Sequence, residues 1–284
     1  MKKLFLVIIT VFFLGCENKK EINLAANEWI GYAPLFYANE MGWLKKENIR
    51  LIRTVSLGES LDLFKNGLVN AFAGTQYEYM QVKNKVVPVI LLDKSYGGDV
   101  VVSNRPLNEL KKARKIDVYL EMDSVNYLLL QYFAKHFGFD MKKFNLINLD
   151  QQEISKKDFG KDPVIIVTYS PYDVVYLKKG FYELANSKSV SELLIVDAVF
   201  LDAECHAENL RGLKGYIDKA IEEIEKNPKK VFSVIKNYYP NYDFDDFKLG
   251  LQKIRWINNP DKEVLSQLKG VNFDTGKLIY ENKN

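Results

Sequence analysis

The sequence has few of the side chains that usually carry catalysis or bind metals. Its 284 residues include only two histidines, His136 and His206, and two cysteines, Cys16 and Cys205. Neither histidine has a cysteine, a histidine or a carboxylate at metal-ligand spacing, so each is better explained as a structural or solvated side chain. Cys205 is better explained as a small buried apolar residue than as a nucleophile. We therefore expect no metal, no cofactor and no disulfide.

Motifs for phosphate binding and nucleophilic catalysis are also missing. The pair Gly97-Gly98 lacks the spacing, and the following Lys or Ser, of a phosphate-binding loop. No Gly-x-Ser-x-Gly sequence occurs. We predict a protein that is not an enzyme.

The chain has no strong excess of charge of either sign. It carries 40 Lys and Arg against 37 Asp and Glu, and loss of Lys2 and Lys3 in a signal segment would leave 38 against 37. A nearly neutral domain has no basic patch for nucleic acid, so we expect no nucleic-acid partner.

No apolar run is long enough to span a bilayer. The longest, Leu4 to Leu14, follows Met1-Lys2-Lys3 and ends at Gly15-Cys16. This order looks like a bacterial lipoprotein signal, which predicts a signal peptide over residues 1–15, a diacylated Cys16 and a short tether over 16–21. The chain would then be exported and membrane-anchored, in the periplasm or at the cell surface. An ordinary secretory signal and an uncleaved anchor are the alternatives.

From Ile22 onward, short apolar runs alternate with amphipathic stretches, which is typical of an α/β domain. The predicted strands are 22–26, 49–55, 70–73, 86–92, 100–103, 116–120, 144–149, 164–168 and 193–200. The predicted helices include 35–44, 56–65, 76–83, 127–137, 209–226, 229–237, 243–254 and 260–268. The polar segment 94–99 and the strand 193–200 are expected to cross between two lobes. Lobe 1 would comprise residues 22–94 plus 200–284, with the C-terminal helices, and lobe 2 residues 95–199.

Aromatic and small polar residues gather at the ends of the predicted strands. In open α/β sheets, ligands bind in the crevice beyond the carboxyl ends of the strands, where helix N-termini also point. The sequence places candidate ligand-binding residues in five such loops: Trp29, Tyr32, Thr75, Gln76, Ser95, Asp99, Ser124, Tyr169 and Ser170. Each also has a structural interpretation, Trp29 as a core residue and Ser124 as a helix cap among them.

These same segments resemble a known family. The sequence from Trp29 to Gly42, WIGYAPLFYANEMG, resembles the opening of the substrate-binding proteins for nitrate, taurine, alkanesulfonates and aminopyrimidine thiamine precursors. Further similar segments are 67–71, 93–99, 124–129, 169–171, Gly180 and 185–187, so that the resemblance spans residues 22–199. Where the family usually has Trp-Glu-Pro, this chain has Tyr169-Ser170-Pro171, so we expect its ligand contacts there to differ.

The resemblance implies a periplasmic-binding-protein type II fold, with two lobes that are each a mixed sheet flanked by helices. It implies a monomeric solute-binding protein that closes around a small molecule and delivers it to the permease of an ABC importer. A ligand-sensing lipoprotein that signals to a membrane receptor, such as a histidine kinase, is the alternative. An enzyme similar to the aminopyrimidine synthases of the superfamily is a further one.

The charges of the predicted cleft loops favour a cationic ligand. The loops carry the acidic residues Glu28, Glu78, Asp99, Asp123 and Asp173, whereas the nearest arginine in the loops is Arg105, slightly beyond the crossing. Carboxylates beside aromatic rings suit an amine or a nitrogen heterocycle, through ion pairing and cation–π contact. Several of these carboxylates have an alternative interpretation as helix caps, and a sulfonate or an oxyanion held by helix N-termini is not excluded.

Overall fold

The computed structural model describes residues 21–190, 192–205 and 210–281. The predicted signal peptide, Cys16 and His206 lie outside these residues. Among the described residues, no helix is both long and apolar enough to cross a membrane.

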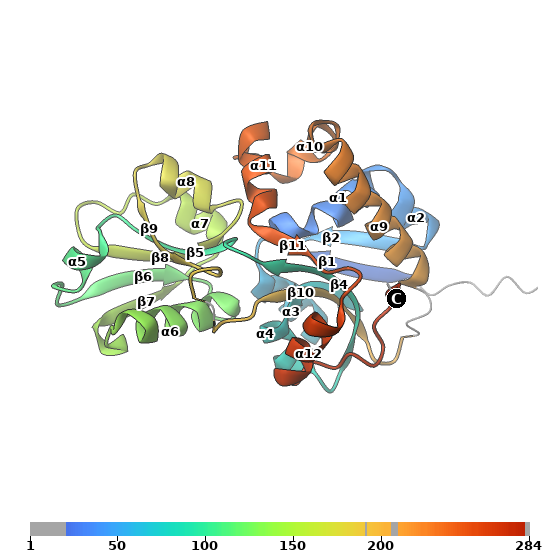
Figure 1. The fold of residues 1–284 in the computed structure, drawn as a ribbon, viewed down its shortest axis with the longest axis horizontal. Helices are drawn as coiled ribbons and strands as arrows, with labels where there is room; N and C mark the ends of the chain where they lie inside the picture. Colours follow the sequence, from blue (N-terminus) through green and yellow to red (C-terminus); the bar gives the residue numbers. More distant parts are fainter. Residues whose placement is uncertain (1–20, 191, 206–209, 282–284) are drawn as a thin grey trace, which may run out of the picture.

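The chain forms two α/β lobes, each built on its own mixed sheet (Figure 1). The first sheet has the order β11-β4-β10-β3-β1-β2, and the second has the order β7-β6-β8-β5-β9. The first comprises β1 (Ile22–Ala26), β2 (Ile49–Arg53), β3 (Ala71–Thr75), β4 (Val86–Ser95), β10 (Val196–Asp202) and β11 (Ile254–Trp256). The second comprises β5 (Asp99–Ser103), β6 (Ile116–Leu120), β7 (Phe144–Asn148), β8 (Val164–Tyr169) and β9 (Tyr182–Asn186). The predicted fold class is therefore confirmed.

Helices cover both faces of each sheet. The first lobe carries α1 (Ala33–Glu40), α2 (Trp43–Lys46), α3 (Leu57–Lys65), α4 (Gln76–Val82), α9 (Arg211–Lys226), α10 (Pro228–Ile235), α11 (Phe244–Gln252) and α12 (Lys262–Gly270). The second carries α5 (Leu107–Leu110), α6 (Val125–Phe137), α7 (Gln151–Lys156) and α8 (Asp173–Lys178). Single turns of 3-10 helix lie at Ile30–Tyr32, Met141–Lys143 and Lys236–Tyr238.

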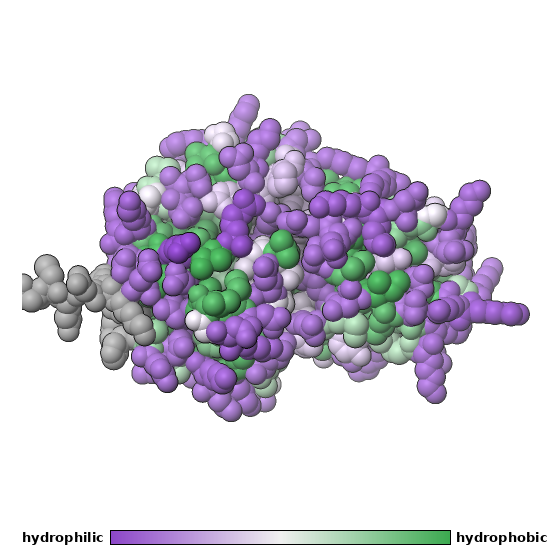
Figure 2. All heavy atoms as spheres, turned by 180° about the vertical axis from the view of Figure 1, so that it is seen from behind, coloured by the Kyte–Doolittle hydropathy of each residue, from purple (hydrophilic) through white to green (hydrophobic). Residues whose placement is uncertain are grey.

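Side chains of β1 point alternately into two hydrophobic cores, one on each face of the first sheet. Leu24 packs into the large cluster that includes α1 and α9, whereas Ala25 packs into a smaller cluster with Leu61 of α3, Tyr79 of α4 and Leu268 of α12. Successive side chains of a strand point to opposite faces, so β1 is buried on both. Outside these cores the surface is mostly hydrophilic, as the rear view in Figure 2 shows.

The helix starts follow capping chemistry that the sequence displays. The side chain of Ser56 accepts from the amide of Glu59, and Ser124 accepts from the amide of Asn126. Thr75 and Glu78 form a reciprocal capping box at the start of α4. The predicted helix over 35–44 is interrupted at Gly42, whose φ of 69° is left-handed, and α2 begins after it.

The chain crosses between the lobes twice, after β4 and after β9. The hydroxyls of Ser95 and Ser187 lie 2.7 Å apart, and the amide of Gly97 donates to Ser187 Oγ at 2.7 Å, so the two crossings are joined. The predicted lobe boundary at residue 199 falls inside β10, whose residues all pair with β3 or β4. Residues 196–199 therefore belong to the first lobe. The predicted boundary differs because an apolar run in the sequence does not reveal which sheet the strand joins.

Candidate functional site

The two lobes meet around a small cavity at one edge of both sheets. It is lined by Asn27, Trp29, Leu57, Thr75, Asp99, Tyr169 and Asp197. β1, β3 and β8 end at this edge, and the antiparallel strands β5 and β10 begin there. The cavity has a volume of about 10 Å³, which is room for roughly one water molecule. The lobes are therefore closed in this structure.

Two aromatic rings from opposite lobes form one wall of the cavity. Trp29 and Tyr169 lie with ring centroids 6.1 Å apart and planes at 77°, an edge-to-face arrangement. The hydroxyl of Tyr169 accepts from Asn27 Nδ2 at 2.9 Å and donates to Glu121 Oε1 at 3.2 Å. Tyr169 thus joins the first lobe to a buried carboxylate of the second.

Burial raises the pKa of several carboxyl groups around the cavity. Burial, followed by repulsion from Glu78 and Asp173, raises the pKa of Asp99 to about 7, although Ser95 opposes this with a hydrogen bond. Burial and the charge of Asp93 raise the pKa of Asp197 well above its usual range, against a hydrogen bond of 2.6 Å from Tyr32. Desolvation penalises the charged form wherever no cation is near.

Buried carboxylates without a cationic partner number five in this region: Glu78, Asp93, Asp99, Glu121 and Asp197. No ion pair found among residues 21–190, 192–205 and 210–281 involves any of them. Burying an unpaired carboxylate costs free energy. These groups are therefore protonated unless a positively charged group binds beside them.

Among the buried side-chain atoms without a hydrogen-bond partner, two acceptors belong to residues that line the cavity, and a third belongs to Glu121, which accepts from the hydroxyl of Tyr169. They are Asn27 Oδ1, Asp99 Oδ2 and Glu121 Oε2. Buried polar atoms normally find partners, so these atoms mark where a ligand would supply donors.

The remaining acidic residues of the predicted cleft have other roles. Glu28 pairs with Arg53 at 2.7 Å, and Asp173 pairs with Lys253. Glu78 accepts from both the amide and the hydroxyl of Thr75. The cap interpretation therefore applies to Glu78, although its second oxygen also accepts from the amide of residue 125 in the other lobe at 3.2 Å.

Four of the nine predicted binding residues line the cavity: Trp29, Thr75, Asp99 and Tyr169. The others are buried nearby, and none of them lines it. The side chains of four make structural hydrogen bonds, whereas Ser170 Oγ has no partner and only the Ser170 carbonyl is bonded. Tyr32 donates to Asp197, Gln76 bonds the backbone of Leu194 and Val196, Ser95 bonds Ser187, Ser124 bonds Glu121 O, and the carbonyl of Ser170 accepts from Ile30. Ser170 precedes Pro171 through a cis peptide bond.

Sequence reasoning missed three lining residues, Asn27, Leu57 and Asp197. Asn27 directly follows the predicted first strand, so its position at a strand end was the signal available. Asp197 lies in an apolar strand, and only the antiparallel pairing of β10 with β3 brings it opposite Thr75.

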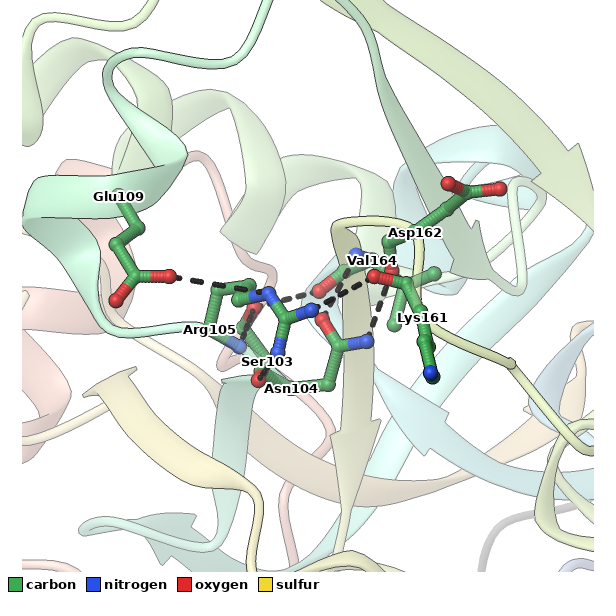
Figure 3. Close-up of polar contacts among 7 residues, drawn as sticks. All are labelled: Ser103, Asn104, Arg105, Glu109, Lys161, Asp162 and Val164. Atoms are coloured by element: carbon green, nitrogen blue, oxygen red, sulfur yellow. Dashed lines mark hydrogen bonds and ion pairs between the residues drawn. The ribbon is translucent and has the colours of Figure 1, made fainter.

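Arg105 lies away from the cavity. Its guanidinium donates to the carbonyl of Lys161 at 2.7 Å and lies 3.8 Å from Glu109, at the end of β5 opposite Asp99 (Figure 3). Arg53, at the end of β2, lies beside another acidic residue of the predicted cleft loops, Glu28. Its guanidinium pairs with Glu28, and its Cζ lies 4.6 Å from the centroid of the Tyr238 ring.

Contacts between the lobes surround the cavity. The amide of Ile30 donates to Ser170 O at 3.3 Å, and Tyr172 donates to Glu28 at 3.1 Å. On the side of α8 and α11, Lys178 pairs with Asp246 at 2.6 Å. Closure of the lobes thus exchanges hydration of these groups for direct contacts.

No candidate metal site is found in the described part of the chain. No group of three or more His, Cys, Asp or Glu residues there is arranged to hold a metal ion. His136 is exposed in the last turn of α6, and Cys205 is half-buried against the core.

Comparisons with known proteins show the fold. No protein-family profile matches the chain, and no curated protein matches its sequence. The alkanesulfonate-binding protein SsuA from Xanthomonas axonopodis pv. citri, bound to MOPS, has a TM-score of 0.71 at 10% identity over 88% of this chain and 90% of its own. The zinc-bound ligand-binding component of an ABC-type import system from Staphylococcus aureus has a TM-score of 0.68 at 13% identity over 89% and 92%.

A third similar structure is the Candida albicans CA3427 gene product, described as having the generic periplasmic binding protein fold. Its TM-score is 0.63 at 13% identity over 93% of this chain and 99% of its own. Identities this low establish the architecture alone, which is the periplasmic-binding-protein fold.

Proposed function

We propose that this chain is an extracytoplasmic solute-binding protein that closes its two lobes around a small, positively charged solute and delivers it to an ABC importer. Cys16, diacylated, would hold it at the membrane. The solute class is an amine, an amidine or a protonated nitrogen heterocycle. The observation that carries the proposal is the pair of buried acceptors Asn27 Oδ1 and Asp99 Oδ2, which belong to residues that line the cavity and have no donor.

The chemistry of the cavity favours a cation over an anion. A sulfonate or nitrate ion offers only acceptors, and the ionised forms of Asp99 and Asp197 would repel it. The indole N–H of Trp29, a donor that an anion would use, already bonds Asp93. A cation between the lobes would instead meet carboxylates and the rings of Trp29 and Tyr169.

The proposed mechanism is hinge closure about the two crossings. The cavity of about 10 Å³ is too small for an organic solute, so the lobes must separate to admit one. A bound cation would then favour closure by the difference between its affinities for the two states. The importer would recognise the closed, loaded form, and no covalent chemistry is involved.

A binding screen tests the ligand class. The full chain in mild detergent is mixed with amines, amidines, aminopyrimidines, sulfonates and nitrate, and its melting temperature is measured. Only the cationic compounds are expected to raise it, because a ligand selective for the native state stabilises that state by mass action. Stabilisation by a sulfonate or nitrate, with none by any cation, would overturn the proposal.

Calorimetry on variants tests the site itself. Asp99→Asn and Asp197→Asn are each expected to weaken binding of the best cation by about tenfold or more, because a charged hydrogen bond in a dry site is lost. Asp162→Asn is the matched control, since Asp162 is exposed at the far end of the second lobe and its side chain should not matter.

Cell experiments test the anchor and the partner. Cys16→Ser should release the chain from the membrane fraction if Cys16 is the acylated residue. Uptake of the labelled solute should fall when the chain is deleted. Normal uptake with an altered transcriptional response would favour the sensor instead.

A further inference from the structure

A second, larger groove lies between the lobes, next to the cavity. It is bordered by α3 of the first lobe and by the residues that follow β6 and β7 in the second, and its volume is about 420 Å³. Every charged side chain that lines it is acidic: Glu59, Asp62, Glu121, Asp123 and Asp150. A cleft lined by one sign of charge concentrates ions of the opposite sign.

The groove and the cavity adjoin each other at two places. Leu57 lines the cavity, whereas Ser56 and Gly58 on either side of it line the groove. Tyr169 lines the cavity, and its hydroxyl donates to Glu121, which lines the groove. The first turn of α3 and the hydrogen bond between Tyr169 and Glu121 therefore lie between the two spaces.

Glu121 supplies an acceptor at this junction. Its residue surface is only 5% exposed. Oε1 accepts from the Tyr169 hydroxyl and from the amide of Gln151 at 3.3 Å. Oε2 has no partner, and the sole partners of this carboxylate are neutral donors. A buried carboxylate with an unused oxygen at the wall of an acidic groove is poised for a positive group.

Each of the two acidic regions also has a leucine from α3 in its lining. Leu57 lies at the cavity and Leu63 at the groove. An alkyl chain that passes the first turn of α3 would meet Leu57 and the edge of Tyr169. A solute with a single small cationic group would occupy the cavity and leave Glu121 Oε2 without a donor.

We propose that the groove is a second subsite of the same binding site, so that the solute carries two positively charged nitrogen groups joined by a short apolar spacer. One group binds between Asp99 and Asp197, and the other binds at Glu121. This inference rests on the proposed function, because it assigns the second half of that ligand.

Calorimetry with matched amines tests it on the full chain. The probes are 1,4-diaminobutane and 1,5-diaminopentane, each compared with the monoamine of the same length. At least one diamine is expected to bind about tenfold or more tightly than its monoamine, since a second charged hydrogen bond forms in a desolvated place. Glu121→Gln should remove this advantage and leave monoamine binding within about twofold, which also shows that the variant folds.

Two further variants complete the design. Asp62→Asn, an exposed change on the groove wall, should lower diamine affinity by a few fold through the local field. Glu153→Gln, an exposed carboxylate of α7 that does not line the groove, should change nothing.

The outcomes separate the two proposals. Equal binding of diamines and monoamines, or an equal loss of both in Glu121→Gln, would overturn the second subsite and leave the proposed function standing. If no cation binds and an anion does, the proposed function itself fails.

Discussion

The indole Nε1 of Trp29 lies 3.2 Å from Oδ1 and 3.3 Å from Oδ2 of Asp93. This bond links the loop after β1 to the last part of β4, and it holds the indole at the cavity wall. Both residues are buried, and burial raises the pKa of Asp93 well above its usual range even though the indole N–H opposes the shift. The ring that is best placed to contact a ligand is thus oriented by a carboxylate behind it.

Trp29→Phe should destabilise the protein by about 1–3 kcal/mol, because it leaves the carboxyl of Asp93 without its donor. The loss should be larger at pH 8 than at pH 5, since the ionised form needs the donor more. Chemical denaturation at both pH values measures this. A loss that is the same at both would show that packing alone is responsible.

Closure of the ligand-free lobes should depend on pH. The pKa of Asp99 is raised to about 7 and that of Glu121 to about 8 in the closed form, against about 4 for such groups in water. The closed form therefore binds more protons between about pH 4 and pH 8, so its stability relative to the open form falls across this range and levels off above the raised pKa values. Small-angle scattering should show a larger radius of gyration at pH 8.5 than at pH 5. The double variant Asp99→Asn and Glu121→Gln should flatten this change, and closure that strengthens with rising pH would contradict it.

Gly98→Ala should hinder closure. A Cβ at Gly98 would lie 2.4 Å from Cη2 of Trp29, well inside van der Waals contact, so the indole or the crossing must move. We expect cation affinity to fall by about tenfold or more, as measured by calorimetry. Gly215→Ala is the control, because a Cβ there meets nothing within 4 Å on helix α9, and it should preserve binding and stabilise by up to about 1 kcal/mol. Unchanged affinity in Gly98→Ala would mean that the site tolerates this displacement.

Two interlobe ion pairs should differ strongly in energy. Lys253→Met leaves Asp173, whose side chain is fully buried, without its cation, and should cost about 3–5 kcal/mol. Lys178→Met breaks the pair with Asp246, in which the lysine side chain is 56% exposed, and should cost at most about 1 kcal/mol. Denaturation of both variants in the same buffer provides the comparison, and similar losses would contradict this ranking.

Much of the architecture is readable from local patterns. The first strand occupies Ile22–Ala26 as predicted, because an apolar run there is bounded by polar residues on both sides. By contrast, β9 was not predicted, because its sequence YELAN is largely polar and two of its residues are exposed at the sheet edge. β11 has only three residues, too few for a period to be detected.

The site was only partly predictable for a different reason. Trp29, Thr75, Asp99 and Tyr169 follow the rule that ligands gather beyond strand ends, so they could be identified before the topology was known. Asp197 and Glu121 depend on pairing between segments that are far apart in the chain, and no local pattern encodes that pairing. Whether the neighbouring residues Gln76 and Ser124 would point inward or cap a helix is decided by packing.

The position of β10 between β3 and β4 also bears on export. The second sheet draws all of its strands from the continuous segment 99–186, so it can assemble as soon as that segment has emerged. The first sheet cannot close until residues beyond 196 arrive to fill the gap between two strands made much earlier. A chain that is still being synthesised therefore carries an unfinished half, whose sequence-distant contacts form late. If the chain is exported as we propose, this delay would keep it competent for threading across a membrane.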